Sequence, residues 1–191
     1  MPTIAEALRR IGSESETDPV PRPSSRQAPV LIEAARDDEL LLPKPGQAEQ
    51  PRFMTQRRAV NDMQATVADR HAQLTALQTL VSDSSQIFEL VKRGENPSPN
   101  IVIGRARRSD VMLIDPTISS VHAVVEMRDA VPYVSDHRSR NGTFVNREPV
   151  KPTDQVALRS GDCVRFGDRV FYYLSGDRLA LFLDMRASGG G

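Results

Sequence analysis

The sequence predicts an all-β protein: an antiparallel β-sandwich preceded by an amphipathic helix and a mostly disordered N-terminal tail. Three observations predict this order. Residues 1–52 hold eight of the 14 prolines and no aromatic residue. Residues 54–83 contain neither proline nor glycine and have a helical period. From Ile87 onward the hydrophobic period changes to two, which is typical of strands.

The tail comprises residues 1–53. Its composition offers too little apolar surface to offset the entropy of ordering, so we expect it to be mostly disordered, with short helical segments. The stretch "IAEALRRI" places Ile4, Leu8 and Ile11 on one helical face, and "VLIEAARDDELLL" predicts a second short helix. Two interpretations stay open: each segment either docks on a partner or is a nascent helix within a tail.

Residues 54–83 are predicted to form one amphipathic helix. Its apolar residues follow alternating three- and four-residue steps, with Arg70 at one expected apolar position, which is a heptad pattern of about three repeats. The residues in this pattern are Val60, Met63, Val67, Leu74, Leu77 and Val81. The pattern fits a homodimer through residues 55–82, and it fits equally a single helix packed on the downstream domain.

Short runs rich in β-branched and aromatic residues begin at Ile87 and are separated by clusters of Gly, Asn, Asp, Pro and Ser. Many short strands with frequent turns predict a sandwich or barrel. We place this domain at residues 84–176. Residues 177–191 form a C-terminal extension, a short helix or a final strand, that ends in a flexible glycine tail.

Four motifs occur in order within this domain: "IGR" at 103–105, "SSVHA" at 119–123, "SRNGTFVN" at 139–146 and "LRSGDCVRFG" at 158–167. Together they resemble the forkhead-associated (FHA) domain over about residues 86–175. The resemblance implies a β-sandwich whose loops at one end bind a phosphothreonine in an extended peptide.

A phosphothreonine carries about −1.5 to −2 charges and three strong acceptor oxygens, so its receptor needs a fixed cation and several donors. Arg105 suits the cation role because its planar fork can hold phosphate oxygens bidentately. Ser120 departs from the family pattern, since many members carry arginine there. By resemblance, the phosphopeptide-binding residues are Arg105, Ser119, Ser120, Arg140 and Asn141, and the residues that support the loops are Gly104, His122 and Gly142.

These residues predict a phosphothreonine-dependent adaptor or regulator in Ser/Thr-kinase signalling. The alternative is a phosphate-independent scaffold that dimerises through its helix, for which Ser120 is the main support. Thr17, among the acids of "SESETDPV", is a candidate phosphosite. Its phosphorylated form is a candidate ligand for the domain itself, in cis or across a dimer.

Composition excludes several other classes. Equal numbers of basic and acidic residues, 25 each, argue against a nucleic-acid coat or a membrane-surface binder. No apolar run approaches the ~20 residues of a membrane span. The single cysteine, Cys163, fits a reducing compartment, so we expect a cytoplasmic protein. We expect no enzyme, metal or cofactor, because the sequence lacks a G-x-S-x-G elbow, a phosphate-binding P-loop and paired Cys or His with zinc spacing.

Overall fold

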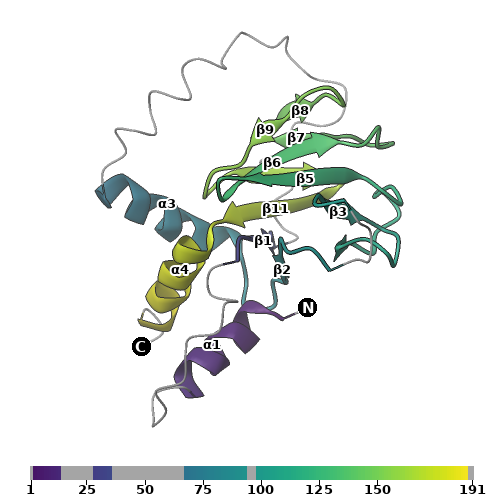
Figure 1. The fold of residues 1–191 in the computed structure, drawn as a ribbon. Coiled ribbons are helices and arrows are strands. Elements are labelled where there is room, and N and C mark those ends of the chain that lie inside the picture. The colour runs from purple at the N-terminus through teal and green to yellow at the C-terminus, as the bar shows by residue number, and fades with distance from the viewer. Residues whose placement is uncertain (1, 14–27, 36–66, 94–97, 189–191) are drawn as a thin grey trace.

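The computed structural model describes residues 2–13, 28–35, 67–93 and 98–188. Two β-sheets pack face to face, and three helices cover the outer face of one of them (Figure 1). The helices are α1 (Ile4–Ser13), α3 (Val67–Leu80) and α4 (Gly176–Ser188). The predicted β-sandwich is therefore confirmed.

The six-stranded sheet has the order β2-β1-β11-β10-β7-β8. In that order its strands are Ile87–Glu89, Val30–Glu33, Arg169–Leu174, Cys163–Phe166, Thr143–Val145 and Glu148–Val150. The five-stranded sheet has the order β4-β3-β5-β6-β9. Its strands are Val111–Met112, Ile101–Gly104, Ala123–Arg128, Val131–Asp136 and Val156–Ala157. The strand pairs are antiparallel except β3 with β4, which is parallel.

The main core lies between the two sheets and follows the period of two. In β5, Ala123 and Val125 are fully buried while Val124 between them is only partly buried. Aromatic rings fill the centre: Phe88 and Phe171 meet edge to face with centroids 5.7 Å apart. Such pairs add stability beyond the area that they bury.

The structure corrects the expectation for "VLIEAARDDELLL". Residues Val30–Glu33 form strand β1 between β2 and β11, and not a short helix in a tail. Val30, Leu31 and Ile32 are all 0% exposed, because Leu31 belongs to the main core while its two neighbours face the helices. A strand buried on both faces reads as a continuous apolar run, so its sequence shows no alternation. Residues 36–42 lie outside the described residues.

Helix α1 packs against the domain that follows it in the chain. Ile4 is 0% exposed and belongs to a second hydrophobic cluster on the outer face of the six-stranded sheet. Thr3 and Glu6 form a capping box at its start: the Thr3 N–H donates to Glu6 Oε2 at 2.9 Å, and the Glu6 N–H donates to Thr3 Oγ1 at 3.3 Å. This predicted helix thus docks within its own chain. The disorder expected for 14–27 and 36–53 falls outside the described residues.

Helix α3 packs into the same cluster. Leu74, Leu77 and Val81 are 3%, 3% and 4% exposed. Of the two interpretations of the heptad pattern, the structure has the helix packed on its own domain. Val60 and Met63 lie outside the described residues.

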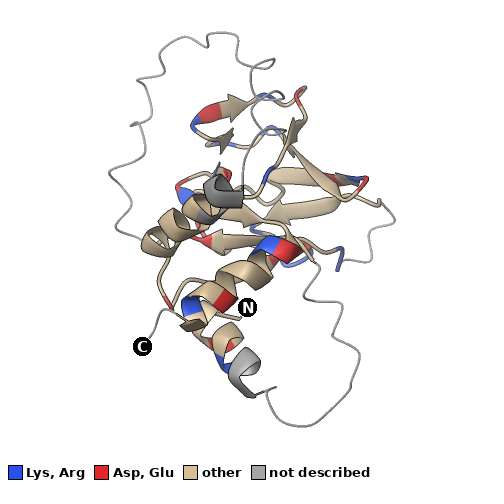
Figure 2. Cartoon of the chain, turned by 90° about the vertical axis from the view of Figure 1, so that its left-hand side faces the viewer, with Lys and Arg blue, Asp and Glu red and all other residues tan. Residues whose placement is uncertain are grey.

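The C-terminal extension is helical over α4, whose Phe182 is 0% exposed in the second cluster. Residues 189–191 are not among those described. Figure 2 shows basic and acidic residues interspersed along the helices and turns, while most of the sheets carry neither. Within the described ranges, no helix is both long and apolar enough to cross a membrane.

Candidate binding site on the loops at one end of the sandwich

Three loops meet at one end of the sandwich. Strand β3 ends at Gly104, β5 begins at Ala123, β6 ends at Asp136 and β7 begins at Thr143. The intervening loops, residues 105–110, 113–122 and 137–142, therefore emerge on the same side. All eight residues predicted for the site and its support lie on these loops or at the strand ends that bear them.

Arg105 is held by its backbone and by one side-chain nitrogen. Its N–H donates to the Ser119 carbonyl at 2.9 Å, and its Nε donates to the Ile118 carbonyl at 3.2 Å. The residue is exposed, and no carboxylate within the described part of the chain forms an ion pair with it. The guanidinium is thus oriented by one loop while its end faces solvent.

Ser119 and Ser120 differ in their surroundings. Ser119 Oγ accepts a hydrogen bond from the Arg140 N–H at 3.0 Å, so its own hydroxyl proton remains available to a ligand. Ser120 is exposed and accepts at its carbonyl from the Ala106 N–H at 3.1 Å. Gly104 lies directly against this carbonyl: an added Cβ would stand 2.3 Å from the Ser120 oxygen. Only glycine allows β3 to end so close to the serine loop.

Arg140 and Asn141 are both exposed at the tip of the third loop. Asn141 Nδ2 donates to the Thr117 carbonyl at 2.7 Å, which ties this tip to the second loop. Gly142 follows with φ of 79°, in the left-handed region that favours glycine. This turn leaves the Asn141 side-chain oxygen and the Arg140 guanidinium on the outer surface.

His122 joins the second and third loops from beneath. It is 0% exposed; its Nδ1 accepts from the Ser119 N–H at 3.1 Å, and its Nε2 lies 3.1 Å from the Gly142 carbonyl. A carbonyl can only accept, so Nε2 carries the proton and the ring is neutral. Burial lowers the pKa of His122 below its usual value, although the Gly142 carbonyl and Asp136 partly oppose this effect.

Asp136 organises the third loop and was missed by sequence reasoning. Its Oδ1 accepts from Ser139 Oγ at 2.6 Å and from Thr143 Oγ1 at 2.8 Å, and its Oδ2 accepts from the Ser139 N–H at 3.0 Å. Burial alone would raise the pKa of Asp136, but these hydrogen bonds, together with His122, lower it overall. In "DHRSRNG", Asp136 is followed three residues later by Ser139. This spacing is typical of a turn held by a side-chain hydrogen bond, and it was the signal in the sequence that could have revealed the role of Asp136.

Thr117 is a second missed residue. Besides receiving Asn141, it donates from Oγ1 to Asp115 Oδ1 at 2.5 Å and accepts there from the Asp168 N–H at 3.1 Å. The last bond spans 51 residues, so no local pattern could have revealed it. The turn at Gly167 and Asp168 thereby supports the second loop.

The loop surface offers donors and cations. Two grooves of about 730 and 770 Å³ lie elsewhere, and none of the eight predicted residues lines either of them. A solvent-facing surface of this kind suits an extended anionic segment better than a small molecule buried in a pocket. Among the described residues, no cluster of His, Cys, Asp and Glu could hold a metal ion. Thr17 is not among the described residues.

The fold and these loops define the class: a β-sandwich binding module with its candidate site on the loops at one end. A family model described as "FHA domain" matches residues 101–167. The chain is 33% identical over 127 residues to the glycogen accumulation regulator GarA of Mycolicibacterium smegmatis, covering 62% of this chain and 77% of that protein. This chain belongs to the FHA domain family.

The chain is similar to two further proteins. The oxoglutarate dehydrogenase inhibitor of Corynebacterium diphtheriae is 38% identical over 96 residues, covering 47% of this chain and 65% of that protein. A solved structure from an analysis of phosphothreonine-dependent FHA domain interactions is 26% identical, with a TM-score of 0.39, covering 46% of this chain and 82% of that one.

Proposed function

We propose that this chain is a phosphothreonine-dependent peptide-binding module that acts as an adaptor or regulator in Ser/Thr-kinase signalling. One observation carries the proposal: the Arg140 N–H donates a hydrogen bond to Ser119 Oγ, beside the exposed side chain of Arg105. Family membership supports the same function, and two similar proteins are named as a regulator and an inhibitor.

Each residue has a distinct part in this proposal. Arg105 supplies the bidentate cation, and the hydroxyl groups of Ser119 and Ser120 donate to phosphate oxygens. Arg140 adds a second cation at the loop tip. Asn141 contacts the peptide backbone, with its side-chain amide positioned by the Thr117 carbonyl.

Gly104, His122 and Gly142 support these contacts from behind. His122 fixes the spacing of the second and third loops through Ser119 and Gly142. Gly104 allows the close approach to Ser120. A preorganised receptor of this kind loses little entropy when the peptide binds, which favours affinity.

The test is a titration of the full chain with a degenerate phosphothreonine peptide library, beside the same library with phosphoserine and with unmodified threonine. We expect binding to phosphothreonine only. Affinity should fall at least about tenfold for Arg105→Ala, since hydrogen bonds to charged groups contribute about 1.5–3 kcal/mol, and about two- to tenfold for Asn141→Ala, whose bond to the peptide backbone joins neutral groups. Arg107→Ala is the matched control: this exposed arginine lies two residues from Arg105 and has no predicted contact with the ligand. Equal binding of modified and unmodified peptides would instead favour the phosphate-independent scaffold.

Thr17 is proposed as an internal ligand in its phosphorylated form, because acidic residues surround it in "SESETDPV". A peptide carrying phosphorylated Thr17 should compete with library peptides for the full chain. No competition at millimolar concentration would remove this proposal and leave the binding function intact. We further propose a cytoplasmic location, where kinases and their phosphorylated targets are found.

A further inference from the structure

Arg165 and Phe144 form a stacked pair on the six-stranded sheet. They lie directly opposite each other on the neighbouring strands β10 and β7. The guanidinium carbon of Arg165 is 3.7 Å from the centre of the Phe144 ring, which is a close cation–π contact. Such a cross-strand pair stabilises the junction of the two strands that bear it.

The pair points away from the main core. Val164 and Phe166, which flank Arg165 in β10, are both 0% exposed and belong to that core. Because successive side chains of a strand point to opposite faces, Arg165 and its partner lie on the outer face of the sheet. Neither residue belongs to the cluster that the helices cover, and both are only partly buried. Their surroundings therefore include neither the core nor the helix-covered cluster.

Phe144 supports the turn that follows Asn141. Gly142 lies against its ring: a Cβ added at Gly142 would stand 3.0 Å from Phe144 Cε2. With its φ of 79°, Gly142 forms the left-handed turn directly after Asn141. The ring that contacts Arg165 on one side thus also contacts the tip of the third loop.

Arg165 holds a second turn, at Gly167. Its Nη1 donates to the Gly167 carbonyl at 2.5 Å. The Gly167 N–H donates in turn to the Gly142 carbonyl at 3.2 Å, so the two turns are joined directly. Gly167 also lies close to Thr117, because an added Cβ would stand 2.7 Å from the Thr117 carbonyl oxygen. Arg165 therefore helps to fix the turn that packs against Thr117.

Thr117 completes the connection to the candidate site. Its carbonyl accepts from Asn141 Nδ2 at 2.7 Å, and its Oγ1 accepts from the Asp168 N–H at 3.1 Å. Two routes thus lead from Arg165 to Asn141, one through the aromatic ring and one through the second turn and Thr117. His122 joins the same loops from inside the core, whereas Arg165 reaches them from the outer face.

We propose that Arg165 is a positioning residue for phosphopeptide binding, which acts through the Phe144 ring and the second turn to orient the Asn141 side chain. While both routes are intact, the Asn141 amide is preorganised and loses little entropy when the peptide binds. Arg165 itself does not contact the peptide. This inference rests on the proposed function, since it assigns a part in that same site.

The experiment titrates the full chain with the degenerate phosphothreonine peptide library, and records the NMR signal of the Asn141 side-chain amide in the absence of peptide. Wild type is compared with three variants. Arg165→Met keeps the length of the side chain without its charge or donors, Arg165→Lys keeps a cation, and Phe144→Leu removes the ring.

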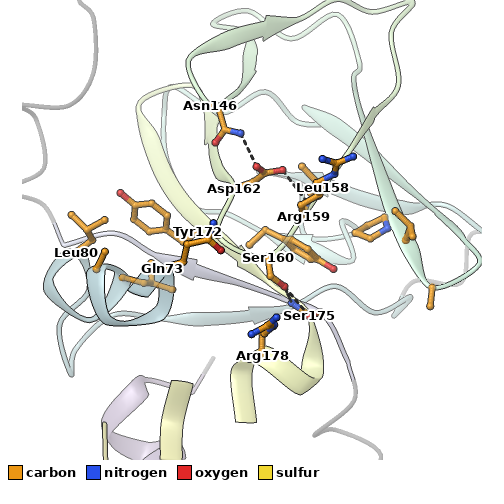
Figure 3. A pocket seen from close by; sticks show the side chains of 17 residues that line it. Gln73, Leu80, Asn146, Leu158, Arg159, Ser160, Asp162, Tyr172, Ser175 and Arg178 are labelled. Carbon is orange, nitrogen blue, oxygen red and sulfur yellow. Dashed lines mark hydrogen bonds between the residues drawn. The ribbon is translucent and has the colours of Figure 1, made fainter. Parts of the chain in front are cut away.

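Arg178→Ala is the matched control. Arg178 is also a partly buried arginine, but it lies on α4 at the edge of a groove of about 730 Å³ (Figure 3). None of the residues predicted for the candidate site lines this groove. This variant therefore removes an arginine without touching the loops.

We expect Arg165→Met and Phe144→Leu each to lower the affinity about two- to fivefold and to shift the Asn141 amide signal. Arg165→Lys should lose less affinity, because an ammonium group can still contact the ring. In an Asn141→Ala background, Arg165→Met should cause no further loss, since the two residues act in series. Arg178→Ala should match wild type in both measurements.

Four results would overturn the proposal: wild-type affinity in Arg165→Met; an Asn141 signal that Arg165→Met leaves unchanged, which would mean that the guanidinium acts elsewhere; additive losses in the Asn141→Ala background; or an equal loss in Arg178→Ala. Thermal unfolding midpoints show whether each variant is folded at the temperature of the titration, and Arg165→Gln replaces Arg165→Met if that variant is not. If wild type itself does not bind phosphothreonine peptides, the proposed function fails, and the Asn141 signal still tests whether Arg165 orients this side chain.

Discussion

The side-chain oxygen of Ser119 accepts the backbone N–H of Arg140 at 3.0 Å, across 21 residues of chain. Together with the bonds of Asn141 and His122, this bond holds the loop that bears the hydroxyl groups against the loop that bears the second arginine. Because the Ser119 hydroxyl acts as acceptor here, its proton points to another partner, and the proposed phosphate is the group that needs a donor.

Ser119→Ala should therefore weaken phosphothreonine peptide binding more than Ser120→Ala does. The first change removes a proposed phosphate donor and the bond to Arg140; the second removes a proposed donor alone. We expect a loss of about tenfold or more for Ser119→Ala, and a few-fold for its neighbour. Calorimetric titration of both variants checks this, and equal losses would contradict the distinct roles.

His122→Ala should destabilise the whole domain. The change leaves the Ser119 N–H without its partner, removes one of the two donors to the Gly142 carbonyl and opens a cavity at a fully buried site. We expect the free energy of unfolding to fall by about 2–5 kcal/mol. His137→Ala is the control, because His137 is exposed directly after the end of β6. Chemical denaturation should show a large loss of stability for His122→Ala and little loss for His137→Ala. A stable His122→Ala protein would refute the bracing role.

Stability should fall as the pH drops below about 6.5, the ordinary pKa of histidine. Burial lowers the pKa of His122 in the folded state, so the unfolded chain takes up the proton first and is favoured. The lowered pKa of Asp136 adds a second loss at more acidic pH, below the ordinary carboxyl range. Urea denaturation at pH 7.5, 6.5 and 5.5 measures the first loss. This loss of stability between pH 7.5 and 5.5 should be smaller in a His122→Gln variant that remains folded. If the variant loses as much stability over this range as wild type, other groups are responsible.

A truncated chain that begins at residue 84 should fail to fold stably. It lacks β1, which pairs with both β2 and β11 and buries Val30, Leu31 and Ile32 completely. Removing it opens the main core at Leu31 and leaves β2 without a partner strand. Circular dichroism and thermal unfolding of the truncated and full chains test this. Leu31→Ala in the full chain is a milder change for comparison, and it should lower the free energy of unfolding by about 2–5 kcal/mol.

Leu77→Ala should lower stability by about 2–5 kcal/mol to the same extent at every protein concentration. Leu77 is 3% exposed within its own chain, so the loss occurs inside one molecule. If the same helix face joined two chains, the unfolding midpoint would rise with concentration in wild type. Ala72→Ser, at an exposed position of α3, is the control and should change little.

Local patterns were enough to predict much of this protein. The strands from Ile87 onward alternate because one face of each meets the core, so their period of two is visible in the sequence. The four motifs marked the loops because their glycines and turn residues are set by backbone geometry close in the chain. The helical spacing of apolar residues likewise predicted the helix that begins at Ile4 and the helix in the heptad segment.

Contacts between distant segments were decided only by the tertiary structure. Strand β1 is a strand because β2 and β11 pair with it and both its faces are covered, conditions that its own residues do not encode as a pattern. The Asp168 N–H reaches Thr117 across 51 residues, and helix α3 buries its heptad face on the sheet. The sequence alone thus determined the class of fold and the motifs of the candidate site, because these depend on local periodicity and turn chemistry. The tertiary structure decided which segments complete the sheet and brace the loops, because such contacts depend on pairing across the folded chain.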